Sequence, residues 1–172
     1  MHKPKIALTI AGTDPSGGAG VMADLKSFHA CGVYGMAAIT SIVAQNTKGV
    51  QHIHNLETSW VQEQLDSVFN DELPHAIKTG MIATHETMEL IQHYLKQHSD
   101  IPYVIDPVML AKSGDSLMDD DTKKHLQNTL LPLADVVTPN IPEAEEITGI
   151  KIDTEENIRK AGNIFICLLY TS

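Results

Sequence analysis

Residues 11–28 have the sequence AGTDPSGGAGVMADLKSF, a glycine-rich loop that leads into an amphipathic segment. The segment before them, KIALTIA at 5–11, has the length and the apolar run of a buried strand. Apolar side chains recur at helical spacing after the loop and predict a helix over 21–31 that ends before Gly32. A strand, a loop and a helix in this order are typical of the start of a βαβ unit.

The same alternation continues along the chain. Short apolar runs predict strands at 5–11, 36–44, 75–79, 103–106 and 135–138. Helical periodicity predicts helices at 21–31, 60–73, 84–96, 119–131 and 142–148. Strands that alternate with helices predict an α/β fold with a mostly parallel sheet. The alternating segment 50–57 predicts either an extra strand at the sheet edge or a small flap.

Composition limits the classes of function. The 172 residues, 42% hydrophobic and 20% charged, predict one globular domain. A net charge of −10 without a Lys/Arg cluster argues against nucleic acid as a partner. The apolar run Ile6 to Ile10 is too short for a signal peptide, and we expect a cytoplasmic protein without membrane spans. The two cysteines and nine histidines show no metal-ligand spacing.

Small, amide or charged side chains follow each predicted strand. These strand exits are Gly12 to Gly18, Gln45 to Thr47, Lys78 to Met81, Asp106 to Val108 and Thr138 to Asn140. In an open parallel sheet, ligands bind beyond the carboxyl ends of the strands. The pattern therefore favours a binding site at that edge of the sheet.

Each residue in the first half of this set also has a purely structural explanation. The loop lacks the P-loop lysine and a clean GxGxxG, so its glycines indicate either a tight turn or a backbone that approaches a ligand closely. Asp24 would complement the helix dipole from the first turn, or face a substrate hydroxyl. Gln45 and Asn46 would form an ordinary turn, or an amide would pair with the edge of a heteroaromatic ring.

The later exits allow similar alternatives. Lys78 would extend to solvent or contact a phosphate, and a turn would suffice to explain Asp106. Asn140 would cap a helix that has Pro142 at its first position. Alternatively, Asn140 and Glu143 would help to hold Mg²⁺ together with phosphates. The acidic run 119–121 indicates a helix start with solvated carboxylates and no further function.

Five segments together resemble, in order and spacing, the hydroxymethylpyrimidine/phosphomethylpyrimidine kinases of the ribokinase superfamily. They are AGTDPSGGAGVMADLKSF, SIVAQNTKGV, AIKTGMIAT, VIDPVMLAKSGDSLM and DVVTPNIPEAEEITG. The resemblance covers residues 4 to about 165. It implies a three-layer αβα ribokinase-like fold, incomplete at the C-terminus. It also implies ATP-dependent phosphorylation of 4-amino-5-hydroxymethyl-2-methylpyrimidine and of its monophosphate in thiamine diphosphate biosynthesis.

The resemblance also implies roles for individual residues. The implied pyrimidine pocket consists of Gly12, Asp24, Gln45, Met81 and Val108. Asp24 would lie near the hydroxymethyl group, and Gln45 would pair with the amino and nitrogen edge of the ring. The implied phosphate and nucleotide side consists of Lys78 and Asn140, with Asp106 and Glu143 toward Mg²⁺.

Members of the resembled family continue to a second glycine-rich loop that carries the catalytic residue. We therefore expect the catalytic residues beyond residue 165. Residues 1–165 would be the N-terminal portion of one kinase domain and 166–172 a non-native tail, or else a strand would end there. On this interpretation the chain alone is inactive, and the full-length protein has the capacity to form a homodimer.

Alternative functions remain at this point. Pyridoxal/pyridoxine kinases share the resembled fold. The QNT at 45–47 favours the pyrimidine enzyme, as does Ala111 where a dual-specificity pyridoxal relative carries cysteine. A non-catalytic pyrimidine-binding module and an unstable fragment are the other hypotheses.

Overall fold

A computed structural model of the protein describes residues 3–109 and 117–170. Its strands are β1 (Ile6–Ala11), β2 (Tyr34–Ile39), β3 (Ser41–Asn46), β4 (Gly49–Asn55), β5 (Ala76–Thr79), β6 (Tyr103–Ile105) and β7 (Val136–Val137). Its helices are α1 (Gly20–Ala30), α2 (Thr58–Phe69), α3 (His85–Gln97), α4 (Asp120–Thr129), the 3-10 turn η1 (Leu131–Leu133), α5 (Ile141–Thr148) and α6 (Glu155–Tyr170). The predicted helices are therefore all present, within a few residues at each end.

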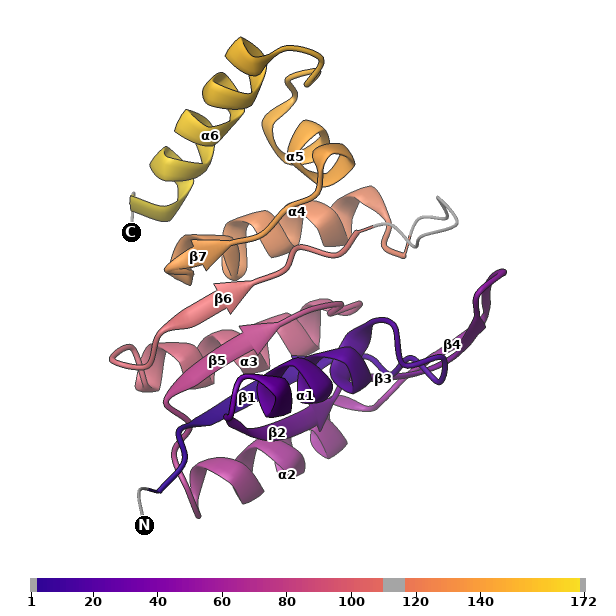
Figure 1. The fold of residues 1–172 in the computed structure, drawn as a ribbon, viewed down its shortest axis with the longest axis vertical. Helices are drawn as coiled ribbons and strands as arrows, with labels where there is room; N and C mark the ends of the chain where they lie inside the picture. The colour runs from indigo at the N-terminus through magenta and orange to yellow at the C-terminus, as the bar shows by residue number, and fades with distance from the viewer. Residues whose placement is uncertain (1–2, 110–116, 171–172) are drawn as a thin grey trace.

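The main sheet has five parallel strands in the order β2-β1-β5-β6-β7. Helix α1 lies on one face, and α2, α3 and α4 lie on the other, which confirms the predicted α/β layers (Figure 1). On β1, Leu8 and Ile10 belong to the main hydrophobic core, whereas Thr9 bonds to α1. Because side chains alternate along a strand, the α1 face of β1 carries the small residues Ala7, Thr9 and Ala11.

The loop between β1 and α1 depends on glycine at one position in particular. Gly20 has φ +55°, and a Cβ there would lie 2.3 Å from the carbonyl oxygen of Gly12. The amide of Val21 donates to that same oxygen at 3.0 Å. The glycine therefore allows the first turn of α1 to close against the end of β1.

The other predicted helix ends behave as expected. Gly32, with φ +72°, follows α1, and the amides of Gly32 and Val33 donate to His29 and Phe28 carbonyls in a Schellman arrangement. Asp119 caps α4, because its carboxylate accepts from the amide of Thr122 at 2.8 Å. The acidic run there thus serves the helix start, as the sequence indicated.

The predicted strand over 36–44 was wrong, because the chain changes partner at Thr40. The amide of Thr40 still donates to the Ala11 carbonyl of the main sheet, but Ser41 begins β3, which pairs antiparallel with β4. These two strands form a separate two-stranded flap that projects from the body of the molecule (Figure 1). Segment 50–57 therefore belongs to a flap and not to the edge of the main sheet.

The C-terminal segment is helical. Helix α6 continues through Phe165 to Tyr170, so a strand in this segment was wrong. Leu168 and Leu169 are partly buried and pack against the core. Within the part of the chain that the structure describes, no helix is both long and apolar enough to cross a membrane. Ala111 lies outside the described residues.

Candidate active site

A cavity of about 800 Å³ lies at the carboxyl ends of β1, β5 and β6, bordered by the glycine-rich loop, the flap and the start of α5. Every residue that the sequence placed in the site lines this cavity: Gly12, Asp24, Gln45, Lys78, Met81, Asp106, Val108, Asn140 and Glu143. The parallel sheet brings together side chains that lie far apart in the sequence, as the rule for strand ends predicts.

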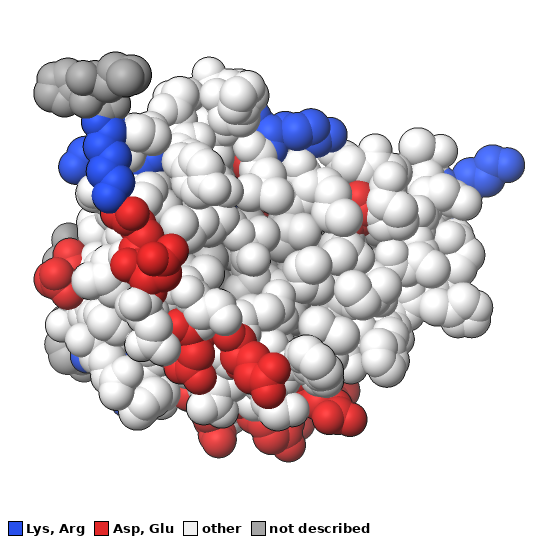
Figure 2. Space-filling view, turned by 90° about the horizontal axis from the view of Figure 1, so that it is seen from below, with Lys and Arg blue, Asp and Glu red and all other residues white. Residues whose placement is uncertain are grey.

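Charge on the surface follows the acidic composition. On the face shown in Figure 2, Asp and Glu side chains gather in one band, while Lys and Arg side chains lie near its rim.

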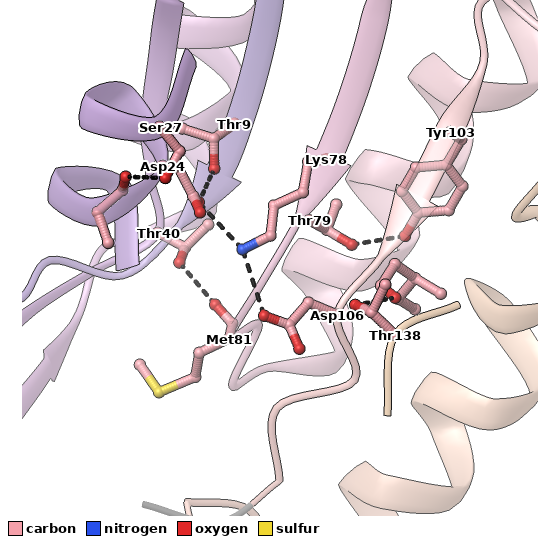
Figure 3. A network of polar contacts seen from close by, with 12 residues as sticks. Thr9, Asp24, Ser27, Thr40, Lys78, Thr79, Met81, Tyr103, Asp106 and Thr138 are labelled. Carbon is pink, nitrogen blue, oxygen red and sulfur yellow. Dashed lines mark hydrogen bonds and ion pairs between the residues drawn. The ribbon is translucent and has the colours of Figure 1, made fainter. Parts of the chain in front are cut away.

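A lysine held between two carboxylates lies at the centre of the site (Figure 3). Lys78 Nζ lies 3.0 Å from Asp24 Oδ2 and 3.4 Å from Asp106 Oδ2. All three side chains are largely shielded from solvent, with 20%, 18% and 34% of their surface exposed. The lysine connects α1 with the residues that follow β6, across the end of β5.

The position of Asp24 differs from one of the predicted alternatives. The first turn of α1 contains no acidic residue, because the helix begins at Gly20 and Asp24 lies one turn further along. Its carboxylate points across to β1 and β5, where it accepts from Thr9 Oγ1 at 2.6 Å and from Lys78. Complementing the helix dipole therefore does not explain this residue.

The pKa values of two carboxyl groups in the cavity are raised. Burial raises the pKa of Asp106, the Lys78 ammonium partly offsets this, and the Asp24 charge adds to it. Burial also raises the pKa of Glu143, hydrogen bonds from backbone amides oppose it, and the nearby Asp106 charge raises it further. Both groups would be stabilised as anions by additional positive charge in the cavity.

Asn140 and Glu143 form a complete capping box at the start of α5. Asn140 Oδ1 accepts from the Glu143 amide, and Glu143 Oε2 accepts from the Asn140 amide, each at 2.9 Å. The predicted helix cap is thus confirmed for Asn140, and the reciprocal bond from Glu143 is a finding of the structure. Glu143 is only 3% exposed, whereas Asn140 is exposed at the cavity rim.

Gln45 reaches the cavity by a different route from the predicted one. It lies in β3 of the flap, next to a register shift between Ala44 and Gln45, and not at the end of a strand of the main sheet. Its side chain lies near the carboxylate of Asp14, at the start of the glycine-rich loop, and helps to lower the pKa of that group. The flap and the loop thereby meet at this amide.

Asp14 is a residue of the site that the sequence analysis missed. Its Oδ1 accepts from the amide and hydroxyl of Ser16 at 2.9 and 2.7 Å, and its Oδ2 accepts from the Gly18 amide at 3.0 Å. Burial acts to raise the pKa of Asp14, but the hydrogen bonds from Ser16, Gln45 and Gly18 lower it to about 2. The DPSG sequence, a common turn pattern, was the available signal.

The apolar walls are closely packed. A Cβ at Gly12 would lie 2.9 Å from Met81 Cε, so a side chain at this position would displace Met81. Thr40 Oγ1 donates to the Met81 carbonyl at 3.1 Å and fixes the turn after β5. With Val43 and Val108 these residues give the cavity a narrow apolar section beside the charged one.

Parallel strands, helices on both faces, and a cavity with a lysine and carboxylates at the strand ends define an α/β protein of the ribokinase-like kinase class. The sequence profile of the phosphomethylpyrimidine kinase family matches residues 14–170. The chain therefore belongs to the phosphomethylpyrimidine kinase family.

Similarity to individual proteins supports this assignment. The chain is 81% identical over 166 residues to the hydroxymethylpyrimidine/phosphomethylpyrimidine kinase of Staphylococcus aureus strain Mu50, which covers 96% of the chain and 60% of that protein. The crystal structure of phosphomethylpyrimidine kinase from Clostridium difficile 630 superposes with a TM-score of 0.88 at 47% identity, and the match covers 95% of the chain and 71% of that structure.

A related specificity is also represented among solved structures. The pyridoxal kinase from Staphylococcus aureus in complex with AMP-PCP and pyridoxal has a TM-score of 0.83 at 34% identity, and the match covers 97% of the chain and 60% of that protein. The chain thus spans about 60% of the length of the curated Staphylococcus aureus pyrimidine kinase that it matches.

Proposed function

We propose that the protein phosphorylates 4-amino-5-hydroxymethyl-2-methylpyrimidine and then its monophosphate, with ATP as the phosphoryl donor, in thiamine diphosphate biosynthesis. The observation that carries the proposal is the cavity in which Gln45 of the flap, Asp24 of α1 and Lys78 of β5 meet. Membership of the phosphomethylpyrimidine kinase family supports it. A cytoplasmic location and a homodimer of the full-length protein form part of the same proposal.

The substrate ring would lie in the apolar section between Gly12, Met81 and Val108. The Gln45 amide lines the cavity near Asp14, and its oxygen and an N–H would pair with the amino group and a ring nitrogen of the substrate. Asp24 would accept a hydrogen bond from the hydroxymethyl group. These contacts orient the hydroxyl oxygen toward the charged section of the cavity.

The charged section would receive the phosphates. In the transfer, the substrate oxygen forms a bond to the γ-phosphorus, the bond to the ADP oxygen breaks, and the hydroxyl proton passes to a base among the catalytic residues beyond residue 165. Lys78 would stabilise the charge that spreads over the transferred group, and Asn140 would contact the nucleotide side. We place the catalytic residues and the rest of the anion-binding loop beyond residue 165, in the part of the relatives that this chain does not span.

The residues present fit a magnesium ion. Mg²⁺ is usually held by one or two carboxylates, water and substrate phosphates. Asp106 is partly exposed to the cavity, and its raised pKa and that of Glu143 indicate carboxylates that positive charge would stabilise. Asp106 would hold the ion directly. Glu143, whose carboxylate caps α5, would contribute negative charge beside Asp106. When bound, the ion would neutralise charge on the phosphates.

Pyridoxal is a second candidate substrate, favoured by the likeness to a pyridoxal kinase at 34% identity. Both compounds are flat heteroaromatic rings with a hydroxymethyl group. They differ at the edge that Gln45 would read, because the pyrimidine offers an amino group beside a ring nitrogen. The Gln45 contact therefore separates the two hypotheses.

Calorimetry with this chain tests the proposal. We expect the pyrimidine to bind and Gln45→Ala to weaken its binding by about 1–3 kcal/mol, because the amide pair is lost. Gln51→Ala is the matched control, since Gln51 lies exposed in the same flap. A full-length version of the protein should consume ATP with the pyrimidine. Equal effects of Gln45→Ala on pyrimidine and ATP affinity, or stronger binding of pyridoxal, would overturn the assignment.

A further inference from the structure

Thr9 is the polar residue of β1 that faces α1, and it is fully buried. Its neighbours on the same face of the strand, Ala7 and Ala11, are also buried and carry no polar side-chain group. A hydroxyl in this setting requires a partner, because an unsatisfied buried polar group is costly. Its partner is Asp24, at 2.6 Å, a length typical of a hydrogen bond to a carboxylate.

The two contacts to Asp24 end on the same oxygen. Thr9 Oγ1 donates to Oδ2 from β1, and Lys78 Nζ lies 3.0 Å from the same Oδ2 from β5 (Figure 3). Thr9 and Lys78 are paired across the neighbouring strands, so the sheet fixes the separation of the two donors. Two donors on one oxygen hold the Asp24 side chain in one χ1 rotamer, define the rotation of its carboxylate and direct Oδ1 away from them.

Asp24 also lines the cavity, whereas Thr9 does not. We propose that Thr9 is a positioning residue that, together with Lys78, fixes Asp24 so that Oδ1 is presented to a hydroxyl group of the ligand. The inference rests on the proposed function, because it takes the hydroxymethyl group of the pyrimidine as that donor. Thr9 acts through Asp24 and does not touch the substrate.

The hydroxyl matters because Lys78 has a second partner. Lys78 Nζ also lies 3.4 Å from Asp106 Oδ2, so its position depends on both carboxylates. A ligand phosphate near Lys78 would draw the ammonium further from Asp24. Within residues 3–109 and 117–170, the Thr9 hydroxyl bonds to Asp24 alone, and it therefore holds Asp24 Oδ2 while the lysine serves the phosphate.

Thr9→Val tests this role, because valine keeps the shape of threonine and removes the hydroxyl. We expect the chain with Thr9→Val to bind 4-amino-5-hydroxymethyl-2-methylpyrimidine roughly tenfold more weakly by calorimetry. Binding of 4-amino-2,5-dimethylpyrimidine, which lacks the hydroxyl, should be unchanged. Thr9→Ser, which retains the donor, should restore most of the selectivity for the hydroxymethyl compound.

Thr79→Val is the matched control. Thr79 is also fully buried in a neighbouring strand, and its hydroxyl pairs with the Tyr103 hydroxyl at 2.6 Å, away from Asp24. This variant should lose stability without changing the ratio of the two affinities. A Thr9→Val variant that weakens both ligands equally, or behaves like Thr79→Val, would overturn the proposal.

A second measurement needs no ligand. Scalar couplings of the Asp24 side chain, measured by NMR, should report one χ1 rotamer in the original chain and in Thr9→Ser, and averaged rotamers in Thr9→Val. Unchanged couplings in Thr9→Val would refute the positioning role. If the original chain binds no pyrimidine, the proposed function fails, whereas the couplings still decide whether Thr9 fixes Asp24.

Discussion

The charge of Asp14 should make a measurable contribution to folding stability. This buried side chain, 2% exposed, holds the glycine-rich loop through three hydrogen bonds from Ser16 and Gly18 and meets Gln45 of the flap. Replacing it with asparagine, in Asp14→Asn, removes the charge and leaves one side-chain oxygen as acceptor. The Gly18 amide then faces an amide nitrogen in place of a carboxylate oxygen.

The size of the effect follows from the pKa of Asp14, which is lowered from 3.8 to about 2 in the folded protein. Such a shift corresponds to about 2 kcal/mol of folding free energy. Because the pKa in the folded state is the lower one, the stabilisation is fully present above about pH 4. It is lost as the pH falls from 3.8 to about 2, and about half of it remains near pH 3.

Urea unfolding followed by circular dichroism measures this directly. We expect Asp14→Asn to lower the free energy of unfolding by about 2 kcal/mol at pH 7, with the difference shrinking to about half near pH 3. Asp100→Asn, a change of an exposed carboxylate in a turn, should alter stability by less than about 0.5 kcal/mol. A difference that stays constant between pH 7 and pH 3 would refute the role of the charge.

Two further predictions concern the loop and the central lysine. Gly20→Ala should destabilise the fold by about 3 kcal/mol or more, since its Cβ would lie 2.3 Å from the Gly12 carbonyl oxygen. Gly32→Ala should cost only about 1 kcal/mol, because Gly32 has φ +72° but no atom within reach of the new Cβ. Similar melting temperatures for the two variants would contradict this. Lys78→Met should lower the free energy of unfolding by roughly 1–2 kcal/mol at pH 7 and by less near pH 4, and urea unfolding at both pH values checks the difference. Losing the lysine raises the already raised pKa of Asp106 further, and protonation of Asp106 at low pH then relieves its repulsion with Asp24.

The periodicity of apolar residues predicted most of the fold, because the spacing of apolar residues in a strand or helix depends on which side of that element is buried. Strands β1, β5, β6 and β7 and helices α1 to α5 follow directly from runs and spacings of apolar residues, whereas α6 was not predicted. The split of 36–44 at Thr40 could not be predicted in this way, since both halves are similar in sequence and only their hydrogen-bond partners differ. The same limitation hid the route by which Gln45 reaches the cavity.

The sequence also predicted most residues of the candidate site, but not Asp14 or Thr9. The residues at the strand ends share one cavity because parallel strands end at one edge. Asp14 and Thr9 were missed for opposite reasons. Asp14 lies in a pattern common to ordinary turns, and Thr9 lies inside an apolar strand, where only the distance to Asp24 reveals its part in the site.

The capping box at the start of α5 has a consequence for how this site can diversify. Glu143 holds the first turn of the helix and also contributes negative charge to the cavity wall. Only glutamine would remove this charge and still accept from the Asn140 amide, so electrostatics and helix stability are coupled for the other neutral side chains at this position. Related enzymes with new substrates are therefore expected to vary the flap and the apolar walls more readily than this corner of the site.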